Sequence, residues 1–377
     1  MQTLNPETGG VARAVTSLSA AMQKCGARIT IVTQDDPAAA WLRDLPLPVH
    51  AVGEAVTSYR YSRSLRDWLR EHIEQFDCAI ANGIWQYHSL ALWQQCRRKA
   101  KPYFVFPHGM LDPWFKHTFP FKHWKKWFYW PWADYRVLRD AAAVIFTSEE
   151  ERILARQSFW LYRANEVVSP LGVEAPPPTG PAAKHLFLAK FPEIEKTRML
   201  LFLGRIHPKK GCDMLINALP RRCSSEAITL ILAGPDQVGW TAELRERIAR
   251  MDVSPRVIFV GMLGGALKRG AFENADAFIL PSHQENFGMS VVEALSYGVP
   301  VLISDKVNIW REIEADRAGY TERDDLAGTT RLVQRWLHTP LPEREQMRTN
   351  ARQCFTRRFE IGRAADSLLK ILREKAQ

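Results

Sequence analysis

The chain lacks the patterns that mark metal-binding, secreted or membrane-spanning proteins. Its six cysteines are scattered and form no Cys-x-x-Cys pair, and no histidine cluster has metal-ligand spacing. Neither a zinc site nor a disulfide framework is therefore indicated, and a reducing compartment is favoured. No apolar run approaches the roughly 20 residues that cross a bilayer, and the first residues lack a basic-then-apolar secretory pattern. We therefore expect a cytoplasmic protein.

The chain also lacks internal repeats and low-complexity segments, and its composition is that of a globular protein. Its 377 residues are enough for two domains, each with its own core. Hydrophobic residues make up 46% and charged residues 24%, which are ordinary values. The net charge of +10 favours anionic partners, namely nucleotides, phospholipids or nucleic acid, without choosing among them.

Short apolar runs alternate with helical patterns along most of the chain. Runs typical of strands cover residues 28–33, 77–81, 103–106, 142–147, 166–168, 199–203, 228–232, 257–260, 276–280 and 299–303. Helical patterns include residues 65–74, 90–99, 149–157, 213–219 and 353–372. Strands that alternate with helices predict an α/β protein whose parallel sheets are covered on both faces.

A proline-rich stretch, residues 173–183, divides the two runs of alternation. Consecutive prolines cannot lie in a helix interior or a central strand, so this stretch predicts a semi-rigid linker. We therefore expect an N-terminal domain over residues 1–175 and a second domain over residues 184–350. Residues 351–377 form the predicted helical tail.

The stretch from Pro281 to Gly298 is the most informative part of the chain. It follows an apolar run typical of a buried strand, and Val291, Ala294 and Leu295 continue it at helical spacing. The first amides of such a helix are unpaired and can receive a phosphate or a sugar hydroxyl. Two carboxylates, Glu285 and Glu293, lie on either side of the turn, and a carboxylate suits a pair of neighbouring hydroxyls.

Three separated motifs resemble one enzyme family. Residues 285–293 match the Glu-x7-Glu motif of the family 4 retaining glycosyltransferases (the group 1 transferases), including the inner Phe287 and Gly288. Residues 204–211 match that family's Gly-Arg-x-x-x-x-Lys-Gly loop, and residues 107–114 resemble a loop of exopolysaccharide-building transferases. The resemblance spans nearly the whole chain. It implies the GT-B architecture, in which two Rossmann-like domains with parallel sheets face a cleft.

The resemblance implies a retaining hexosyltransferase that uses a UDP- or GDP-sugar as co-substrate. Arg205 and Lys210 would hold the diphosphate, whose charge grows as the sugar departs. Glu293 would hold the ribose and His108 would act at the reaction centre, although a lone histidine is more often structural. Glu285 would bind the donor hexose together with the amides of Asn286, Phe287, Gly288 and Met289.

Glycines supply further donor-binding candidates. Gly9 and Gly10 precede a helical pattern, and in the resembled family such a pair follows the first strand and faces the donor. Only residues 1–6 come before this pattern, so the strand is shortened or the true start lies upstream. Gly234 follows a strand and resembles a nucleotide-contacting turn.

No cofactor or metal is expected. The sequence contains no Asp-x-Asp, the sign of a metal site in the other main transferase fold. The basic pair Arg205 and Lys210 would take the place of magnesium.

Residues 114–136 combine many aromatic and basic side chains with a single acid, Asp134. This mixture suits an anionic membrane interface, and it would also suit single-stranded nucleic acid. We expect some of the rings to lie in the core and the rest on the inner membrane, where the protein would be peripherally bound. Loss of Lys122, Lys125 and Lys126 should then weaken binding to anionic liposomes.

The acceptor is expected to be a polyprenyl-diphosphate-linked oligosaccharide of exopolysaccharide, lipopolysaccharide or O-antigen assembly, although a soluble acceptor stays open. Candidate acceptor residues follow two strands: Asn82, Trp85, His88 and Asp112. One alternative is a nucleotide-sugar epimerase of the same fold. Another is a nucleic-acid-binding protein, but no recognised motif supports a nucleic-acid partner.

Overall fold

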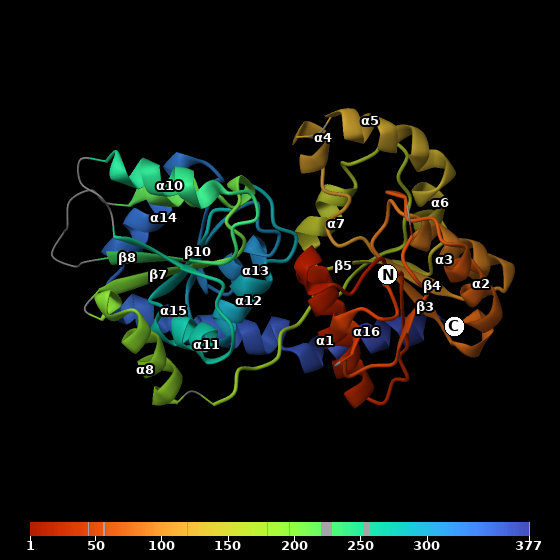
Figure 1. Cartoon of the computed structure of the whole chain (residues 1–377), viewed down its shortest axis with the longest axis horizontal. Coiled ribbons are helices and arrows are strands. Elements are labelled where there is room, and N and C mark those ends of the chain that lie inside the picture. The colour runs from red at the N-terminus through yellow and green to blue at the C-terminus, as the bar shows by residue number, and fades with distance from the viewer. Residues whose placement is uncertain are drawn as a thin grey trace. The chain divides into compact units, whose positions relative to one another are not determined.

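The computed structural model describes residues 1–43, 45–55, 57–118, 120–178, 180–195, 197–219, 228–251 and 256–376. The chain divides into two compact units (Figure 1). Unit 1 contains Met1–Glu174 and Arg358–Gln377, and unit 2 contains Ala175–Arg357. The chain therefore leaves unit 1 once and returns to it for its last helix. Among the described residues, no helix is both long and apolar enough to cross a membrane.

Unit 1 contains two parallel sheets. The larger has the order β3-β4-β5-β6, and β1 and β2 form the smaller. The strands are β1 (Ile31–Thr33), β2 (Val49–Ala51), β3 (Ala79–Asn82), β4 (Tyr103–Phe106), β5 (Ala143–Phe146) and β6 (Glu166–Val168). The helices are α1 (Gly10–Lys24), α2 (Arg63–His72), α3 (Tyr87–Arg98), α4 (Trp114–Thr118), α5 (Pro120–Tyr129), α6 (Asp134–Arg139), α7 (Glu149–Ala155) and α16 (Ile361–Lys375). Helix α1 packs on α16, and α3 packs on α2 and α6.

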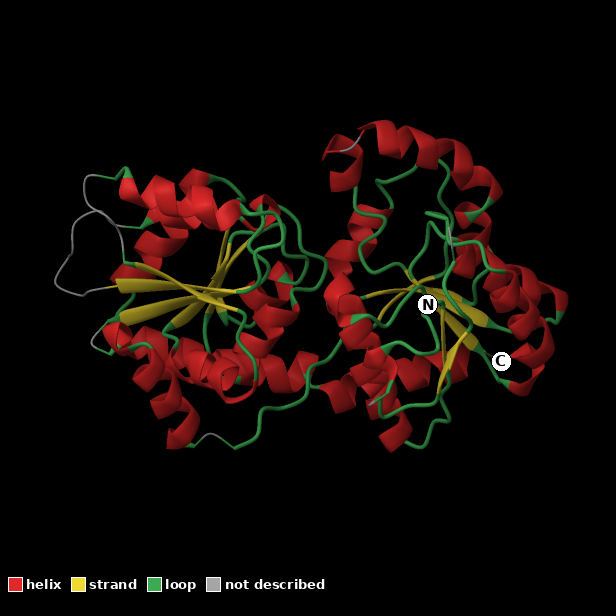
Figure 2. Ribbon diagram, viewed as in Figure 1, coloured by secondary structure: helices red, strands yellow, loops and turns green. Residues whose placement is uncertain are grey.

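Unit 2 contains one six-stranded parallel sheet with the order β12-β11-β10-β7-β8-β9. Helices lie on both sides of it (Figure 2). The strands are β7 (Arg198–Leu203), β8 (Ile228–Ala233), β9 (Val257–Gly261), β10 (Ala277–Leu280), β11 (Val301–Ser304) and β12 (Gly319–Glu322). The helices are α8 (Pro181–Lys190), α9 (Cys212–Ala218), α10 (Trp240–Ala249), α11 (Gly265–Asn274), α12 (Met289–Ser296), α13 (Trp310–Ala315), α14 (Leu326–His338) and α15 (Leu341–Cys354).

Short helical turns connect these elements. The 3-10 turns are Pro6–Thr8, Ala40–Leu42, Ile73–Gln75, Trp130–Trp132, Pro192–Ile194 and Pro208–Lys210. A π-helical segment, Phe355–Phe359, follows α15. It lies where the chain passes back from unit 2 to unit 1.

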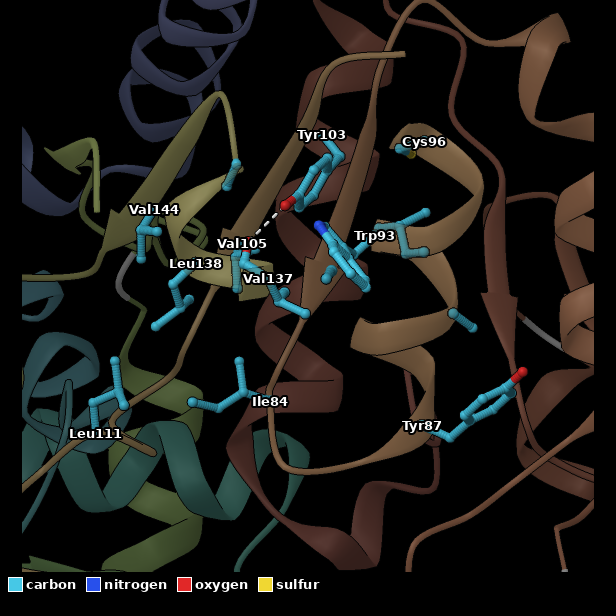
Figure 3. Packing of buried hydrophobic residues seen from close by; sticks show 14 of the residues in the cluster. Ile84, Tyr87, Trp93, Cys96, Tyr103, Val105, Leu111, Val137, Leu138 and Val144 are labelled. Atoms are coloured by element: carbon cyan, nitrogen blue, oxygen red, sulfur yellow. Dashed lines mark hydrogen bonds between the residues drawn. The ribbon is translucent and has the colours of Figure 1, made fainter. Parts of the chain in front are cut away.

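The core of unit 1 forms between the β3–β6 sheet and its helices (Figure 3). Strands β4 and β5 are buried along their whole length, as continuous apolar runs predict for strands covered on both faces. Tyr103 is buried among these side chains and donates its hydroxyl hydrogen to the carbonyl oxygen of Val137 at 2.7 Å. This bond satisfies a polar group that would otherwise be costly to bury.

The expected α/β architecture is confirmed, with four local differences. The helix expected over residues 353–372 is divided: α15 ends at Cys354, the π-helical segment follows, and α16 begins at Ile361. Every strand expected from the sequence is present, but β2 and β12 were missed because they are short and not uniformly apolar. Residues 181–183, expected in the linker, begin α8, since Pro181 fits a first helical turn where a missing N–H costs nothing. Residues 1–5 form no strand. Their backbone lies along β1, with Met1 N bonded to Val32 O and Gln34 N to Gln2 O.

Candidate active site

The two loops with the strongest sequence motifs begin at adjacent strands in the middle of the unit 2 sheet. Strand β7 pairs with both β8 and β10, so the strand order runs outward from this point in both directions. Loops after such neighbouring strands diverge at the carboxyl edge and leave a crevice where ligands bind. Residues 204–211 follow β7 and residues 281–288 follow β10.

These two loops are joined by both backbone and side-chain contacts. Ser282 Oγ and His283 N donate to Lys209 O at 3.0 and 2.9 Å. The Lys210 ammonium contacts the Glu285 carboxylate, and both side chains are largely buried. The structure thus brings together two predicted residues that are 75 positions apart in the chain.

The pKa of the Lys210 ammonium is lowered by its surroundings. Burial, together with the charges of Lys209 and Arg205, lowers the pKa of Lys210 from 10.5 to about 7. The touching Glu285 carboxylate favours the charged form. A cation held in a desolvated loop beside further basic side chains is suited to an anionic ligand such as a diphosphate.

Arg205 lies on the same loop as Lys210 and donates to Gln237 Oε1 at 3.1 Å. Its loop packs on the loop after β8, where Ile206 N bonds to Pro235 O at 2.9 Å. Gly234 permits this packing: its φ is +148°, and a Cβ there would lie 1.8 Å from the Gly204 carbonyl oxygen. The structure therefore supplies a packing reason for Gly234, which the sequence motif had suggested only as a nucleotide contact.

The Glu285 loop is held from the β11 side and ends in a glycine cap. Glu285 N donates to Lys306 O at 2.9 Å, and Asn308 N donates to Glu285 O at 3.0 Å. Gly288 is left-handed (φ 73°) and forms the N-cap of α12 without a side-chain hydrogen bond. The following amide, that of Met289, belongs to the first helical turn, which has no intrahelical acceptor. Asn286 lies near Asn308 and Phe287 is buried.

Glu293 projects from the second turn of α12 and pairs with a residue that the sequence did not single out. Lys268 Nζ, on α11, lies 2.7 Å from Glu293 Oε1, and both side chains are mostly buried. A lysine at a single helix position has no recognisable sequence pattern. Only the packing of α11 beside α12 revealed this contact.

In unit 1, His108 lies in the loop after β4 and bonds to the end of β3. Its Nε2 is 2.9 Å from Asn82 Oδ1, and its ring stacks on Phe106 at 5.3 Å. Because Asn82 Oδ1 can only accept, Nε2 carries the hydrogen and Nδ1 is left as an acceptor. Burial lowers the pKa of His108 to about 4, so the ring is neutral at pH 7.

Two non-glycine residues of these loops adopt left-handed backbone conformations, His108 (φ 50°) and Trp85 (φ 73°). Such conformations cost about 1–3 kcal/mol and are found disproportionately at functional sites. Other contacts hold both loops together. Trp85 Nε1 donates to Met110 O at 3.0 Å, and Gly83 N donates to Phe106 O at 2.8 Å.

The remaining acceptor candidates have clear structural contacts. His88 is buried, and its Nε2 lies 3.0 Å from Asn82 O and 3.1 Å from Gly83 O, so it supports the β3 loop from the core side. Burial lowers the pKa of His88 to about 3. Asp112 Oδ1 accepts from Trp114 N at 2.8 Å, at the start of α4. Gly9 is the N-cap of α1, and Gly10 is its first residue.

Lys126 lies against the loop after β3 and against α4. Its Nζ is 4.4 Å from the ring centroid of Trp85 and 5.5 Å from that of Phe115, which are cation–π distances. Beneath Trp85, the fully buried Asp134 accepts from Trp85 N at 3.1 Å. Of the other two lysines predicted for a membrane face, Lys125 is exposed. The side chain of Lys122 lies outside what the structure describes.

The aromatic-basic segment divides between core and surface. Trp130 is fully buried and stacks on Phe159 at 4.3 Å. The exposed aromatic face, as we call it, comprises Phe121, Trp124, Trp127, Phe128, Trp132 and Trp160. Trp160 comes from a different part of the chain and joins this face through Trp127, with ring centroids 6.0 Å apart. Four of these rings, Trp124, Trp127, Phe128 and Trp160, form a chain of ring contacts, which makes them more than a scatter of surface residues.

Glu151, which reasoning from the sequence missed, connects the loops after β4 and β5. Its carboxylate is buried and accepts from Gly109 N at 2.5 Å and from Thr147 N and Oγ1, each at 2.7 Å. The segment 147–151 reads Thr-Ser-x-x-Glu, the capping-box pattern, and Ser148 caps α7. That pattern predicts a helix start, but it does not predict that the glutamate reaches the His108 loop.

Among the residues that the structure describes, no three His, Cys, Asp or Glu side chains gather as ligands for a metal ion.

The fold is that of the GT-B glycosyltransferases. The structure of HepE from Anabaena, in complex with UDP and glucose, aligns with a TM-score of 0.78 over 99% of this chain and 98% of that one, at 18% identity. Two family models also match: "Glycosyl transferase 4-like domain" over residues 9–172 and "Glycosyl transferases group 1" over residues 185–354. Each half of the chain therefore matches a glycosyltransferase family model.

Curated relatives match parts of the chain. The D-inositol 3-phosphate glycosyltransferase of Jonesia denitrificans is 27% identical over 234 residues, which are 58% of this chain and 54% of the relative. The lipopolysaccharide core biosynthesis mannosyltransferase LpsB of Rhizobium meliloti is 31% identical over 106 residues, 27% of this chain and 30% of the relative. The chain thus spans about half, or less, of the length of these relatives.

Proposed function

We propose that this protein is a retaining glycosyltransferase that transfers a hexose from a nucleotide sugar to an acceptor hydroxyl. The observation that carries the proposal is the contact of Lys210 with Glu285 where the two central loops of the unit 2 sheet diverge. A buried cation and a carboxylate at that point offer one group for a diphosphate and one for sugar hydroxyls.

The proposal assigns a protein side chain or backbone amide to each part of the nucleotide sugar. Arg205 and Lys210 hold the diphosphate and stabilise the charge that develops as the sugar leaves. Glu293 holds the ribose hydroxyls. Glu285 and the amides of residues 286–289 bind the hexose, with Gly288 setting the direction in which α12 begins. His108 acts on the transferred sugar as a neutral hydrogen-bonding group.

Retention of the anomeric configuration follows if the acceptor hydroxyl attacks from the face that the diphosphate leaves. The acceptor oxygen then bonds to the anomeric carbon as the bond from that carbon to the diphosphate breaks, and the leaving phosphate oxygen takes up the acceptor proton. The basic side chains of the β7 loop stabilise the charge of the departing diphosphate. We propose that no metal is required. Activity that survives EDTA would agree, and activity lost in EDTA and restored by magnesium would contradict it.

UDP is the first donor nucleotide to test. HepE, which shares the fold, is known in complex with UDP-glucose. A GDP-sugar is the second choice, since LpsB is a mannosyltransferase and its sequence resembles this chain.

The proposed acceptor is a polyprenyl-diphosphate-linked oligosaccharide at the anionic inner-membrane surface, in lipopolysaccharide or exopolysaccharide assembly. The exposed aromatic face and the exposed Lys125 support it, because amphipathic rings lie at headgroup depth and lysines attract anionic lipids. LpsB acts in lipopolysaccharide core biosynthesis. The Jonesia relative, named for D-inositol 3-phosphate, keeps a soluble acceptor as the second choice.

The test is a thermal-shift screen of the whole protein against UDP-, GDP- and dTDP-sugars. We expect a shift with one nucleotide class, and its loss in Arg205→Ala. Arg250→Ala is the matched control, because Arg250 is a largely exposed arginine of unit 2 outside the two loops. A shift that persists in Arg205→Ala, or no shift with any nucleotide, would refute the proposed donor site. Epimerised sugar without an acceptor would point to an epimerase.

A further inference from the structure

A buried carboxylate outside the sequence motifs connects the His108 loop to the neighbouring strand. Glu151 Oε1 accepts from Gly109 N at 2.5 Å, and Glu151 Oε2 accepts from Thr147 N and Thr147 Oγ1, each at 2.7 Å. Glu151 is only 3% exposed. Three donors from two loops thus converge on one side chain of α7.

The bond to Gly109 acts directly on the backbone of His108. The peptide group between residues 108 and 109 is planar, so fixing the Gly109 N–H fixes the orientation of the His108 carbonyl. His108 has a left-handed φ of 50°, which a non-glycine residue keeps only when surrounding contacts impose it. Glu151 supplies one such contact, and Asn82 supplies another through the ring.

We propose that Glu151 is a positioning residue for His108, holding the imidazole in the place and orientation that sugar transfer requires. This inference rests on the proposed function, since it concerns the residue that the proposal assigns to the transferred sugar. Glu151 itself touches no reacting atom in this scheme. It acts through the hydrogen bond that it accepts from Gly109 N and through the two that it accepts from Thr147, which fix the loop after β4 to the loop after β5.

The chemistry of the three donors explains why a carboxylate is needed. Ionised glutamate only accepts hydrogen bonds, and both of its oxygens are used here. Glutamine has one accepting oxygen and one donating NH2 group, so whichever way the amide turns, an N–H faces another N–H. Because Thr147 offers two donors and Gly109 only one, the amide oxygen should face Thr147 and the NH2 group should face the Gly109 N–H. Glu151→Gln therefore preserves the shape of the side chain and breaks the hold on the His108 loop.

The test compares Glu151→Gln with Glu150→Gln, which makes the same charge change one position earlier on the same helix. For Glu151→Gln we expect kcat to fall about a hundredfold, the scale of a misplaced catalytic group. The Kd for UDP should stay within about twofold, because the donor loops belong to unit 2. Glu150→Gln should match the wild type in both quantities.

Hydrogen–deuterium exchange supplies a readout that does not depend on turnover. The peptide covering residues 107–113 should exchange at least about tenfold faster in Glu151→Gln than in Glu150→Gln, because the Gly109 amide loses its acceptor. Normalising kcat to the folded fraction separates positioning from simple loss of stability. If Glu151→Gln does not fold, Glu151→Asp, which keeps two accepting oxygens on a shorter arm, takes its place.

Two results would overturn the inference. One is faster exchange of residues 107–113 with kcat per folded molecule unchanged, and the other is a fall in kcat without any change in exchange. Failure of the proposed function is distinguishable, because a wild-type protein that binds no nucleotide and transfers no sugar refutes that proposal alone. The exchange comparison would still test whether Glu151 holds the loop.

Discussion

Two buried ionisable side chains, Lys210 and Asp134, have their pKa values moved toward neutrality by burial, from opposite directions. Burial lowers the pKa of Lys210 to about 7 and raises that of Asp134 to about 7. Lys210 lies in the proposed diphosphate site, whereas Asp134 supports the β3 loop beneath Trp85. The shift at Lys210 should make the Kd for UDP depend on pH, and the shift at Asp134 should make the stability of unit 1 depend on pH. The two effects can be measured separately.

Binding of UDP should weaken as the pH rises above 7. A bound diphosphate favours the charged ammonium, so Lys210 takes up a proton on binding wherever it is neutral in the free protein. Above its free-state pKa of about 7 the Kd should rise by up to about tenfold per pH unit. Isothermal titration calorimetry at pH 6.5, 7.5 and 8.5, in buffers of different ionisation enthalpy, measures both Kd and proton uptake.

The control for this prediction is Lys210→Arg. Arginine stays charged throughout this range, so its Kd should be nearly constant between pH 6.5 and 8.5. A wild-type Kd that is equally flat, with no proton uptake, would contradict the role given to Lys210.

Asp134→Asn should stabilise unit 1 at alkaline pH. Asp134 is fully buried, and the hydrogen bonds that its carboxylate accepts from Trp85 N at 3.1 Å and from Ser89 Oγ at 3.3 Å do not offset the cost of burying its charge. The pKa of Asp134 is 3.8 in the unfolded chain and about 7 in the folded protein. The folded protein therefore holds the extra proton between these values, and stability falls as the pH rises through that window.

The free energy of unfolding falls by about 1.4 kcal/mol per pH unit where the folded state binds one proton more than the unfolded state. The side-chain amide introduced by Asp134→Asn does not titrate. The free energy of unfolding of that variant should therefore exceed that of the wild type by at least about 1 kcal/mol at pH 8. Urea unfolding followed by tryptophan fluorescence checks this, since ten of the 13 tryptophans lie before residue 175. Asp36→Asn, at an exposed position, is the control, and an Asp134→Asn protein less stable than wild type at pH 8 would refute the argument.

At the scale of single elements, α5 and the turn after it present all of the exposed aromatic face except Trp160. Trp124 and Phe128 lie one turn apart on α5, with ring centroids 5.0 Å apart, and Phe121 is 87% exposed. Lys126 points instead to Trp85, so the lysines of this segment do not act alike. The aromatic side of α5 is therefore the part proposed to contact the membrane, whereas Lys126 contacts Trp85 in the loop after β3.

Replacing three rings of this face should abolish most liposome binding. We expect Phe121→Ser/Trp124→Ser/Phe128→Ser to co-sediment with anionic liposomes at least about tenfold less, because buried apolar area sets the affinity. Lys125→Ala should weaken binding modestly and make it less sensitive to salt. The matched control is Val238→Ser/Leu326→Ser/Leu341→Ser, three exposed apolar residues of unit 2. Equal sedimentation of the two triple variants would exclude this face as the membrane contact.

At the scale of the whole molecule, the chain crosses between its units twice, and the two crossings meet in unit 1. Val173 N donates to Phe359 O at 2.9 Å, and Ile361 N donates to Val173 O at 3.1 Å. Helix α16 then packs on α1 and buries Leu368, Leu369 and Leu372. The last residues of the chain thus complete the core of the unit in which the chain began.

Gly172→Ala should loosen this closure. A Cβ at residue 172 would lie 2.5 Å from Ile361 Cα, so the start of α16 would have to shift, at a cost of about 1–3 kcal/mol. We expect a lower melting temperature for unit 1 and an unchanged Kd for UDP. Gly180→Ala, where an added Cβ meets nothing within 4 Å, is the control. Identical melting of the two variants would show that α16 tolerates the shift.

Much of the fold could be predicted from the sequence because its signals are local. Buried parallel strands are continuous apolar runs, and all such runs became strands. Strand β2 was missed because none of its three residues is buried, and α8 was missed because its first residues, beginning with Pro181, have the composition of a linker. The motif around Glu285 is likewise local, because the strand before it, the turn and the helix after it are consecutive in the chain.

The sequence by itself determined the α/β class, the donor-loop motifs and the aromatic-basic segment, because each depends on residues close together in the chain. Only the tertiary structure decided which distant side chains meet: Lys210 with Glu285, Lys268 with Glu293, and Glu151 with the His108 loop. It also decided which rings of residues 114–136 are exposed and that Lys126 lies on Trp85. Such contacts depend on how strands and helices pack, and a single sequence does not encode that packing in any local pattern.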